Sequence, residues 1–188
     1  MRSKYPDPIG GLLWFGVDDA ATSVYIPIYC GTKEVPECFR QGNGSMTEFS
    51  WTSFFWINNW VANMAYSRYN VMIQDIRKEM NELENYFNRS LEASDRTAEQ
   101  VYLKDEQSGF QFITQHSLSC AQFAFDRWKK LGEFLMIRYI DGNIKKVKDG
   151  KFEETPDKMV AFPDQPGYDE TYYRHIIRET GNRLKVKK

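Results

Sequence analysis

The chain has 188 residues, of which 41% are hydrophobic and 15% aromatic, and a formal net charge of −1. This length and composition suit one folded domain with a sizeable core and exclude a disordered chain. The near-neutral charge gives no general attraction to nucleic acid or to an anionic membrane, so neither is expected as a partner.

The first expected element is an antiparallel hairpin over about residues 12–30. Residues 12–17, LLWFGV, form a short apolar run bounded by turn residues, which is typical of a buried strand. The extended pattern resumes at Val24 and continues to Tyr29. Pro27 lies within this second run and cannot donate to a sheet ladder, so the second strand is expected to be bulged or to lie at an edge.

A helical region is expected over about residues 50–138. Ser50 stands where an N-cap is needed, and apolar residues surround the helix that follows it, which predicts burial on most sides. From Tyr69 onward the apolar residues narrow to one stripe, as in an amphipathic helix.

The polar segment 95–107 is expected to begin the return of the chain, with Gly109 as a possible break. Apolar residues then recur at helical spacing from Ile113 to Leu135. These two long helices should pack as an antiparallel pair.

The remaining residues, about 139–188, are expected to form a small charged excursion and a last helix. Asp149 and Gly150 give a turn signal within the excursion. Asp169 is placed to open the helix and Gly181 to end it. No convincing linker divides the chain, so residues 1–188 are expected to be a single domain or a fragment of one.

The three cysteines make an odd count, which does not indicate a disulfide framework. Cys30 and Cys38 could pair around a small loop, but free thiols fit equally well. His116 shares a predicted helix face with Cys120, yet no third orienting group or oxyanion element accompanies them. Core packing is therefore favoured over a nucleophile pair, and no catalytic residue is assigned.

Neither a zinc site nor a membrane segment is expected from the sequence. The spacing of the two histidines, His116 and His175, suits no familiar zinc site. Residues 1–11 lack the apolar core of a secretory signal, and no apolar run reaches the about 18 to 20 residues that span a bilayer. The chain is expected to be soluble, and its compartment is left open.

Several segments together resemble the C-terminal part of the cysteine dipeptidase family of N-terminal nucleophile hydrolases, the dipeptidase A-like enzymes to which secernins are related. They are WFGVDDAATSVYIPIY, WTSFFWINNWVANMAYSRYNVMIQDIRKEMNELE, WKKLGEFLMIRYIDGNIKKVKDGKF and the ending PDQPGYDETYYRHIIRETGNRLKV. The resemblance runs over nearly all of the chain. It implies an α+β fold: the helix-rich C-terminal part of an αββα sandwich, with one antiparallel hairpin and a long antiparallel helix pair.

The resemblance also implies a chemistry, the hydrolysis of dipeptides by a cysteine at the mature N-terminus, without a metal or an organic cofactor. The thiolate attacks the peptide carbonyl while the free α-amino group serves as base. The first cysteine here is Cys30, at the end of a predicted strand, so the family's nucleophile has no counterpart. The chain alone is therefore expected to be inactive, as the C-terminal part of such an enzyme.

Two partners are implied: the missing N-terminal part, or an equivalent chain, and a dipeptide in the complete enzyme. An uncovered sheet edge and apolar face would also favour a homo-oligomer. The alternative, in a different functional class, is a catalytically inert helical interaction domain that binds another polypeptide.

The candidate substrate-binding residues of this chain lie in the turn of the hairpin: Asp18, Asp19, Thr22 and Ser23. The two carboxylates could lie near the ammonium group of a dipeptide or orient a pocket loop. The structural alternative is a turn in which Asp and Ser side chains bind backbone donors. Consecutive side chains on an extended segment point to opposite faces, which disfavours a paired acid–base mechanism.

Overall fold

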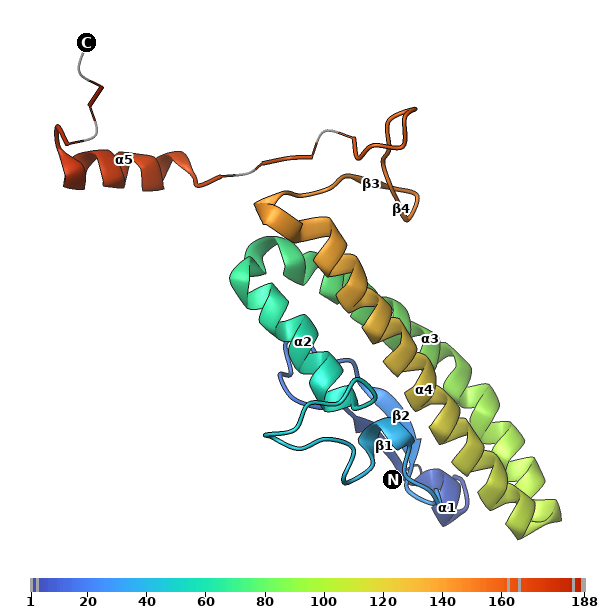
Figure 1. Ribbon diagram of the computed structural model, residues 1–188. Coiled ribbons are helices and arrows are strands. Elements are labelled where there is room, and N and C mark those ends of the chain that lie inside the picture. Colours follow the sequence, from blue (N-terminus) through green and yellow to red (C-terminus); the bar gives the residue numbers. More distant parts are fainter. Residues whose placement is uncertain (1, 3, 162, 166, 184, 187–188) are drawn as a thin grey trace. The chain divides into compact units, whose positions relative to one another are not determined.

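The computed structural model describes residues 2, 4–161, 163–165, 167–183 and 185–186 (Figure 1). Its described elements are long helices and two small antiparallel hairpins, so the predicted helix-rich α+β class is confirmed. The chain divides into two compact units, residues 1–136 and 137–188, each of which is described by itself. The expected single domain stays a prediction.

The first hairpin joins β1 (Leu12–Phe15) to β2 (Ile26–Tyr29), close to the predicted bounds. The strands pair antiparallel from Leu12 opposite Tyr29 to Phe15 opposite Ile26. Helix α1 (Asp7–Gly10) precedes them. The backbone N–H of Tyr29 donates to Ser117 Oγ at 3.1 Å, so a helix side chain satisfies this donor of β2. Ile26 and Tyr29 are fully buried, and this anchors the hairpin in the core.

The helix after the hairpin begins later than predicted. After a single 3₁₀ turn, η1 (Glu37–Phe39), the chain reaches α2 (Phe54–Ser67), whose N-cap is Ser53 rather than Ser50. The Ser50 hydroxyl instead accepts from the N–H of Thr52 at 3.3 Å and donates to Asn43 Oδ1 at 2.7 Å. Ser50 therefore closes the preceding loop, and the prediction of its capping role was wrong.

Two further corrections concern where the long helices begin and end. Arg68, with φ −152° and ψ 57°, separates α2 from α3 (Tyr69–Lys104), where one continuous helical stretch was expected. Segment 95–107 does not begin the return, because α3 continues through most of it. The turn is instead at Asp105, whose Oδ2 accepts from the N–H of Ser108 at 2.7 Å in the first turn of α4 (Glu106–Tyr139).

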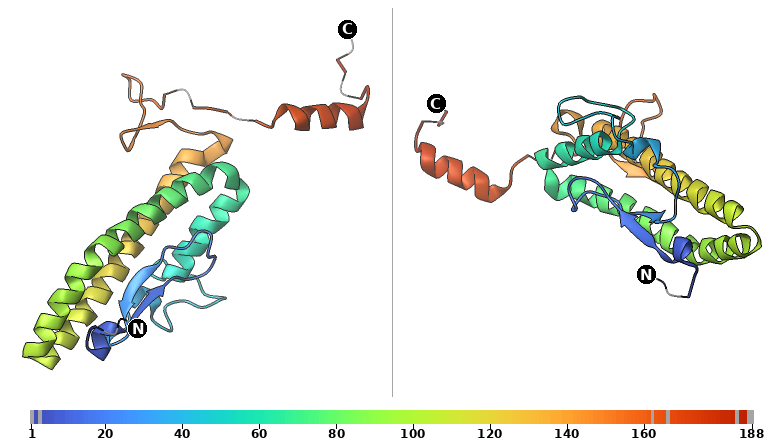
Figure 2. Two further views of the ribbon diagram at one scale, coloured as in Figure 1. Left: turned by 180° about the vertical axis from the view of Figure 1, so that it is seen from behind. Right: turned by 90° about the horizontal axis from the view of Figure 1, so that it is seen from below.

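Helices α3 and α4 form the predicted antiparallel pair (Figures 1 and 2). Near the corner, a Cβ on Gly109 would meet Tyr102 at 2.6 Å. Farther along, the ring of Phe123 lies 5.2 Å from that of Tyr86. Residues later in α4 therefore contact residues earlier in α3, as expected for an antiparallel pair. The fully buried side chains between and around these helices include Ile76, Leu83, Phe87, Ile113, Trp128 and Leu135.

Helix α2 completes the core of the first unit against α4. Phe54 lies edge-on to Phe125, with ring centroids 5.9 Å apart. A Cβ on Gly132 would come within 2.3 Å of the indole of Trp60, so α4 needs a glycine where α2 approaches it. This close packing fixes α2, and with it the loop between β1 and β2 that α2 contacts.

The second unit contains the other hairpin and the last helix. Strands β3 (Val147–Lys148) and β4 (Lys151–Phe152) pair through the Asp149–Gly150 turn, whose φ values of 51° and 76° suit a two-residue hairpin. A 3₁₀ turn, η2 (Ile140–Gly142), precedes them.

Helix α5 (Glu170–Thr180) has the predicted caps. Asp169 Oδ1 accepts from the N–H of Tyr172 at 2.8 Å, and Gly181 ends the helix with φ 55°. Within the described part of the chain, no helix has the length and apolar character needed to cross a membrane.

Candidate functional site

The loop between β1 and β2 carries all four predicted substrate-binding residues and is held by its own side chains. Asp19 Oδ1 accepts from the N–H of Ala21 at 2.9 Å, and Asp19 Oδ2 accepts from the Thr22 hydroxyl at 3.3 Å. The Ser23 hydroxyl donates to the carbonyl of Val17. Asp18 is exposed and has φ 65°. The Asp19 contact is the bond to a backbone donor that the structural alternative predicted, whereas Ser23 donates to a backbone carbonyl instead.

The four side chains differ in how far they are exposed to solvent, and therefore in whether a ligand could reach them. Thr22 and Ser23 are only 0% and 2% exposed, so they belong to the interior. Asp18 is exposed and Asp19 is half-buried, and both carboxylate oxygens of Asp19 already accept hydrogen bonds from the protein. Substrate binding by all four residues stays a prediction, and the geometry offers Asp18 and Asp19 as its accessible part.

Two residues of α2 tether this loop. The Tyr66 hydroxyl donates to Asp19 Oδ2 at 3.1 Å, and this hydrogen bond raises the pKa of Tyr66. Asn58 Nδ2 donates to the carbonyl of Val17 at 3.3 Å. Asn58 is fully buried, and its Oδ1 has no hydrogen-bond partner among the residues that the structure describes. The side-chain amide of Asn58 thus holds the β1–β2 loop against α2.

The other two asparagines of α2 contribute less to the loop. Asn59 Nδ2 donates to the Phe55 carbonyl at 2.9 Å, and Asn63 Nδ2 donates to the Asn59 carbonyl at 2.8 Å. Both bonds stay within the helix. Of the three helix amides, Asn58 is the one whose side chain positions the loop.

Beside the loop lies a groove of about 300 Å³, which we call the aromatic groove. Its apolar lining includes Phe15 of β1, Phe39 of η1 and Phe55 and Trp56 of α2. Phe15 and Phe39 meet edge to face with centroids 4.8 Å apart. The Trp56 Nε1–H donates to the carbonyl of Ser45 at 3.1 Å, which holds the loop after η1 against α2.

The sequence analysis did not predict the aromatic groove, because it gave no element or role to the segment between the hairpin and the helical region. Two glycines were the available signal: Gly42 and Gly44 have φ 88° and 82°, values that L side chains rarely adopt. A Cβ on Gly44 would also meet the Trp56 ring at 3.0 Å. The glycines let the backbone pass close to the indole and form one wall.

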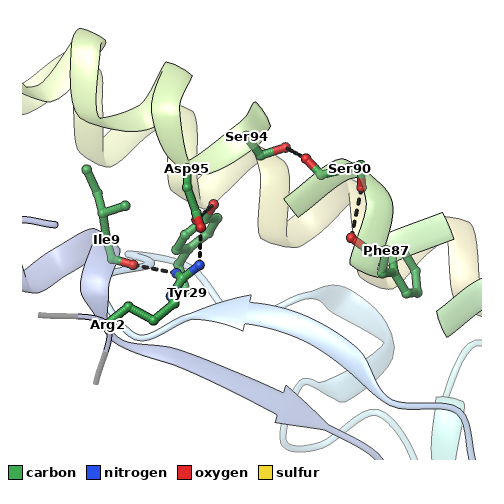
Figure 3. Close-up of polar contacts among 7 residues, drawn as sticks. All are labelled: Arg2, Ile9, Tyr29, Phe87, Ser90, Ser94 and Asp95. Carbon is green, nitrogen blue, oxygen red and sulfur yellow. Dashed lines mark hydrogen bonds and ion pairs between the residues drawn. The ribbon is translucent and has the colours of Figure 1, made fainter. Parts of the chain in front are cut away.

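A buried polar cluster joins the start of the chain, β2 and α3 (Figure 3). The Tyr29 hydroxyl donates to Asp95 Oδ1 at 2.7 Å, and Arg2 forms an ion pair with Asp95 Oδ2. Arg2 Nη2 also donates to the Ile9 carbonyl at 2.7 Å. Burial, and then the hydrogen bond to Asp95, raise the pKa of Tyr29 far above its usual value. The cluster ties the start of the chain to β2 and α3 and so stabilises the fold.

The cysteines do not form an activated nucleophile in this structure. All three are free, and burial raises the pKa of Cys38 and of Cys120 to about 12. Cys120 Sγ lies 3.6 Å from His116 Nδ1, but burial lowers the pKa of His116. Both groups are therefore held neutral, whereas a thiolate–imidazolium pair would need both charged.

No group of three or more His, Cys, Asp or Glu side chains in the described part of the chain is arranged to hold a metal ion. The loop offers hydrogen-bonding groups, and the aromatic groove offers apolar contact.

Comparison with known proteins gives one match. Residues 1–82 match the family model described as peptidase family C69. No curated protein and no solved structure matches the chain. The matched residues include the first hairpin with its loop, the aromatic groove, all of α2 and the start of α3.

Proposed function

We propose that this chain, whose residues 1–82 match the model of peptidase family C69, is the C-terminal part of a dipeptidase-like hydrolase. In the complete enzyme a cysteine supplied by another segment would attack the dipeptide carbonyl. This chain would supply the scaffold and part of the substrate pocket. The observation that carries the proposal is the family match over the segment that holds both the β1–β2 loop and the aromatic groove.

The state of the thiols supports a nucleophile from outside this chain. Cys38 and Cys120 are buried with raised pKa values, which disfavours their thiolates at neutral pH. Cys30 is exposed, but it directly follows Tyr29, the buried end of β2. Cleavage before Cys30 would free the strand end that pairs with Leu12, at a cost in pairing and packing.

A complementation assay tests the proposal. The purified chain is assayed for release of free amino acids from dipeptides, alone and after addition of the N-terminal region of the enzyme. We expect no hydrolysis by the chain alone and hydrolysis by the mixture, unchanged by Cys30→Ala. Hydrolysis by the chain alone would contradict the proposal, and loss of that activity in Cys30→Ala would then identify Cys30 as the nucleophile.

A second candidate function is an inert helical domain that binds another polypeptide, and α5 favours it. None of the α5 residues is buried, and Tyr172, Tyr173 and Ile177 are 43%, 47% and 65% exposed. An exposed apolar helix face of this kind is typical of an interaction surface. If this is the function, the chain should bind the N-terminal region without hydrolysis, and Ile177→Asp should weaken that binding in analytical ultracentrifugation.

A further inference from the structure

We propose that helix α5 of one copy of this chain docks into an acidic groove on the first unit of a second copy, so that two copies exchange their last helices. The acidic groove lies between the segment after β2 and helix α4, and its lining includes Glu34, Val35, Glu37, Leu118, Phe123 and Asp126. This inference does not depend on the proposed hydrolase activity. It also differs from the second candidate function, because the dimer needs no N-terminal region.

Helix α5 needs a surface to pack against. It has 11 residues, and none of them is buried. A helix this short is only marginally stable in water by itself, because packing of an apolar face supplies most of the stability of helices in proteins. The rings of Tyr168 and Tyr172 stack with centroids 4.2 Å apart, but Tyr173 and Ile177 are 47% and 65% exposed. These last two residues, four positions apart, form an apolar stripe that is open to solvent.

Two arginines accompany the apolar stripe of α5. Arg174 lies three positions before Ile177 and four before Arg178, so these side chains are neighbours on the helix surface. Arg174 Nε pairs with Glu170 at 3.2 Å, but the two side chains are 75% and 74% exposed, and an ion pair this exposed is weak. Arg178 has no ion-pair partner among the residues that the structure describes. Both guanidinium groups can therefore bind carboxylates of a partner.

The acidic groove has the apolar floor that the stripe requires. The N–H of Lys33 donates to Thr114 Oγ1 at 3.0 Å, which fixes the segment after β2 against α4. Val35 and Phe123 are 55% and 38% exposed, and Leu118 is half-buried. The groove has a volume of about 550 Å³, compared with about 300 Å³ for the aromatic groove, so it can receive both side chains of the stripe.

Carboxylates accompany this apolar floor. Glu34, Glu37 and Asp126 line the groove and are exposed, together with one cation, Arg40. The pKa of the buried Cys38 thiol is raised to about 12, mainly by burial and further by the charges of Glu37 and Asp126, so both carboxylates lie near the same atom. Three carboxylates and one guanidinium leave an excess of two negative charges in the groove. This excess matches the two arginines of an incoming α5.

Chain length favours a second copy as the source of the docked helix. Asp164 pairs through its backbone with Ile144, five positions after the end of α4. The five residues between Asp164 and Glu170 span at most about 20 Å when fully extended. Phe123, in the groove, lies about 24 Å before the end of α4. The same chain could bring its stripe there only with this link fully extended, whereas a second copy has no such limit.

Sedimentation velocity of the whole chain, over a range of protein concentrations, tests the exchange. Each copy has one α5 and one acidic groove, so reciprocal docking closes at two copies. We expect a monomer that converts to a dimer as the concentration rises. Ile177→Ser should raise the dissociation constant at least about tenfold, because it removes apolar contact from each docked helix. The control Ile140→Ser, at a residue that is 44% exposed and lies outside α5, should leave it unchanged.

Charge reversals identify the two surfaces. Arg178→Glu and Asp126→Arg should each weaken the dimer about fivefold to tenfold, because each brings like charges together at both contacts. An equimolar mixture of the two variants should regain the dimer, since each docked helix then meets an opposite charge. Both side chains are exposed, so the circular dichroism of each variant should match that of the unchanged chain. The control Lys148→Glu changes the net charge as Arg178→Glu does and should not weaken the dimer.

Three results would overturn the inference: a monomer at every concentration, a dimer that neither Ile177→Ser nor the charge reversals weaken, or a mixture as weak as its separate components. The last result would show that α5 does not dock into the groove of another copy. These measurements need neither a substrate nor the N-terminal region. Failure of the complementation assay therefore leaves this inference standing, and failure of the dimer leaves the proposed function standing.

Discussion

Two tyrosine–aspartate pairs in the first unit have the same chemistry and opposite surroundings. Tyr29 donates to Asp95 at 2.7 Å, and Tyr66 donates to Asp19 at 3.1 Å. Tyr29 and Asp95 are 0% and 3% exposed, whereas Tyr66 is 59% exposed. Arg2 completes the buried pair through its ion pair with Asp95. The difference separates an aspartate buried in the core from one that holds a surface loop to α2.

The pKa shifts of the two tyrosines follow the same division. The pKa of Tyr29 is raised first by burial and only then by Asp95. The pKa of Tyr66 is raised first by its hydrogen bond to Asp19. Changes at the buried pair should therefore alter mainly the free energy of unfolding, and changes at the exposed pair mainly the order of the β1–β2 loop.

The largest effect is expected from Asp95→Ala. The substitution leaves the Tyr29 hydroxyl and the Arg2 guanidinium without their acceptor in a buried site. Breaking a buried charged contact of this kind costs several kcal/mol, and because Arg2 is partly exposed we expect about 3 kcal/mol. Urea unfolding followed by circular dichroism measures the loss.

The control for this change is Tyr29→Phe, which removes one hydrogen bond and keeps the ring. It should cost only about 1 kcal/mol. If Asp95→Ala lost no more than Tyr29→Phe, Arg2 would not need its anion, and the buried pair would not differ from the exposed one.

Gly132→Ala should have the next largest effect, and it disturbs the helix that carries Tyr66. The new methyl group would lie 2.3 Å from the Trp60 indole, so α2 and α4 would have to separate. Overpacking of this kind costs about 1 to 3 kcal/mol. Trp60→Leu should restore part of the stability in the double variant, as measured by thermal unfolding. Additive losses would show that the two residues do not clash.

Alkaline pH should lower the free energy of unfolding, because a buried thiol then loses its proton. The pKa of Cys120 rises from 9.0 to about 12 on burial, so the folded state holds this proton after the unfolded state has released it. The stability contribution is complete below pH 9 and falls by about 1.4 kcal/mol per pH unit until the folded pKa is reached.

Cys120→Ala should remove one such group and flatten the pH dependence of the unfolding free energy between pH 9 and pH 10.5. Cys30→Ala, at an exposed thiol, is the matched control and should leave the slope unchanged. Equal slopes in all three proteins would mean that Cys120 ionises as readily in the folded protein as in the unfolded one.

Local patterns predicted much of the fold. The hairpin from Leu12 to Tyr29 follows from two short apolar runs around a turn, and the last helix follows from Asp169 and Gly181 at its ends. In both cases the signal lies within a few residues of the feature that it specifies. Local reasoning failed at Arg68, because no glycine or proline in the sequence marks the break between α2 and α3.

The site was less predictable because its parts come together over long sequence separations. Asp95 lay in a polar segment that was expected to be a return loop, yet it is buried because Arg2, 93 positions earlier, pairs with it. Asp19 and Tyr66 are separated by 47 positions. The turn contacts of Asp19 could be inferred from its neighbours, but its tether to α2 and the aromatic groove beside it could not.

The smallest effect on stability is expected at the exposed pair. Tyr66→Phe removes the hydroxyl that donates to Asp19 Oδ2, and because Tyr66 is 59% exposed, water replaces it. The free energy of unfolding should change by no more than about 0.5 kcal/mol. The loop should become less ordered, however, and the amide of Ala21, which donates to Asp19, should exchange faster with solvent, because Asp19 is no longer tied to α2. A stability loss as large as that of Asp95→Ala, with the exchange of the loop amides unchanged, would mean that the exposed pair serves the fold as the buried pair does.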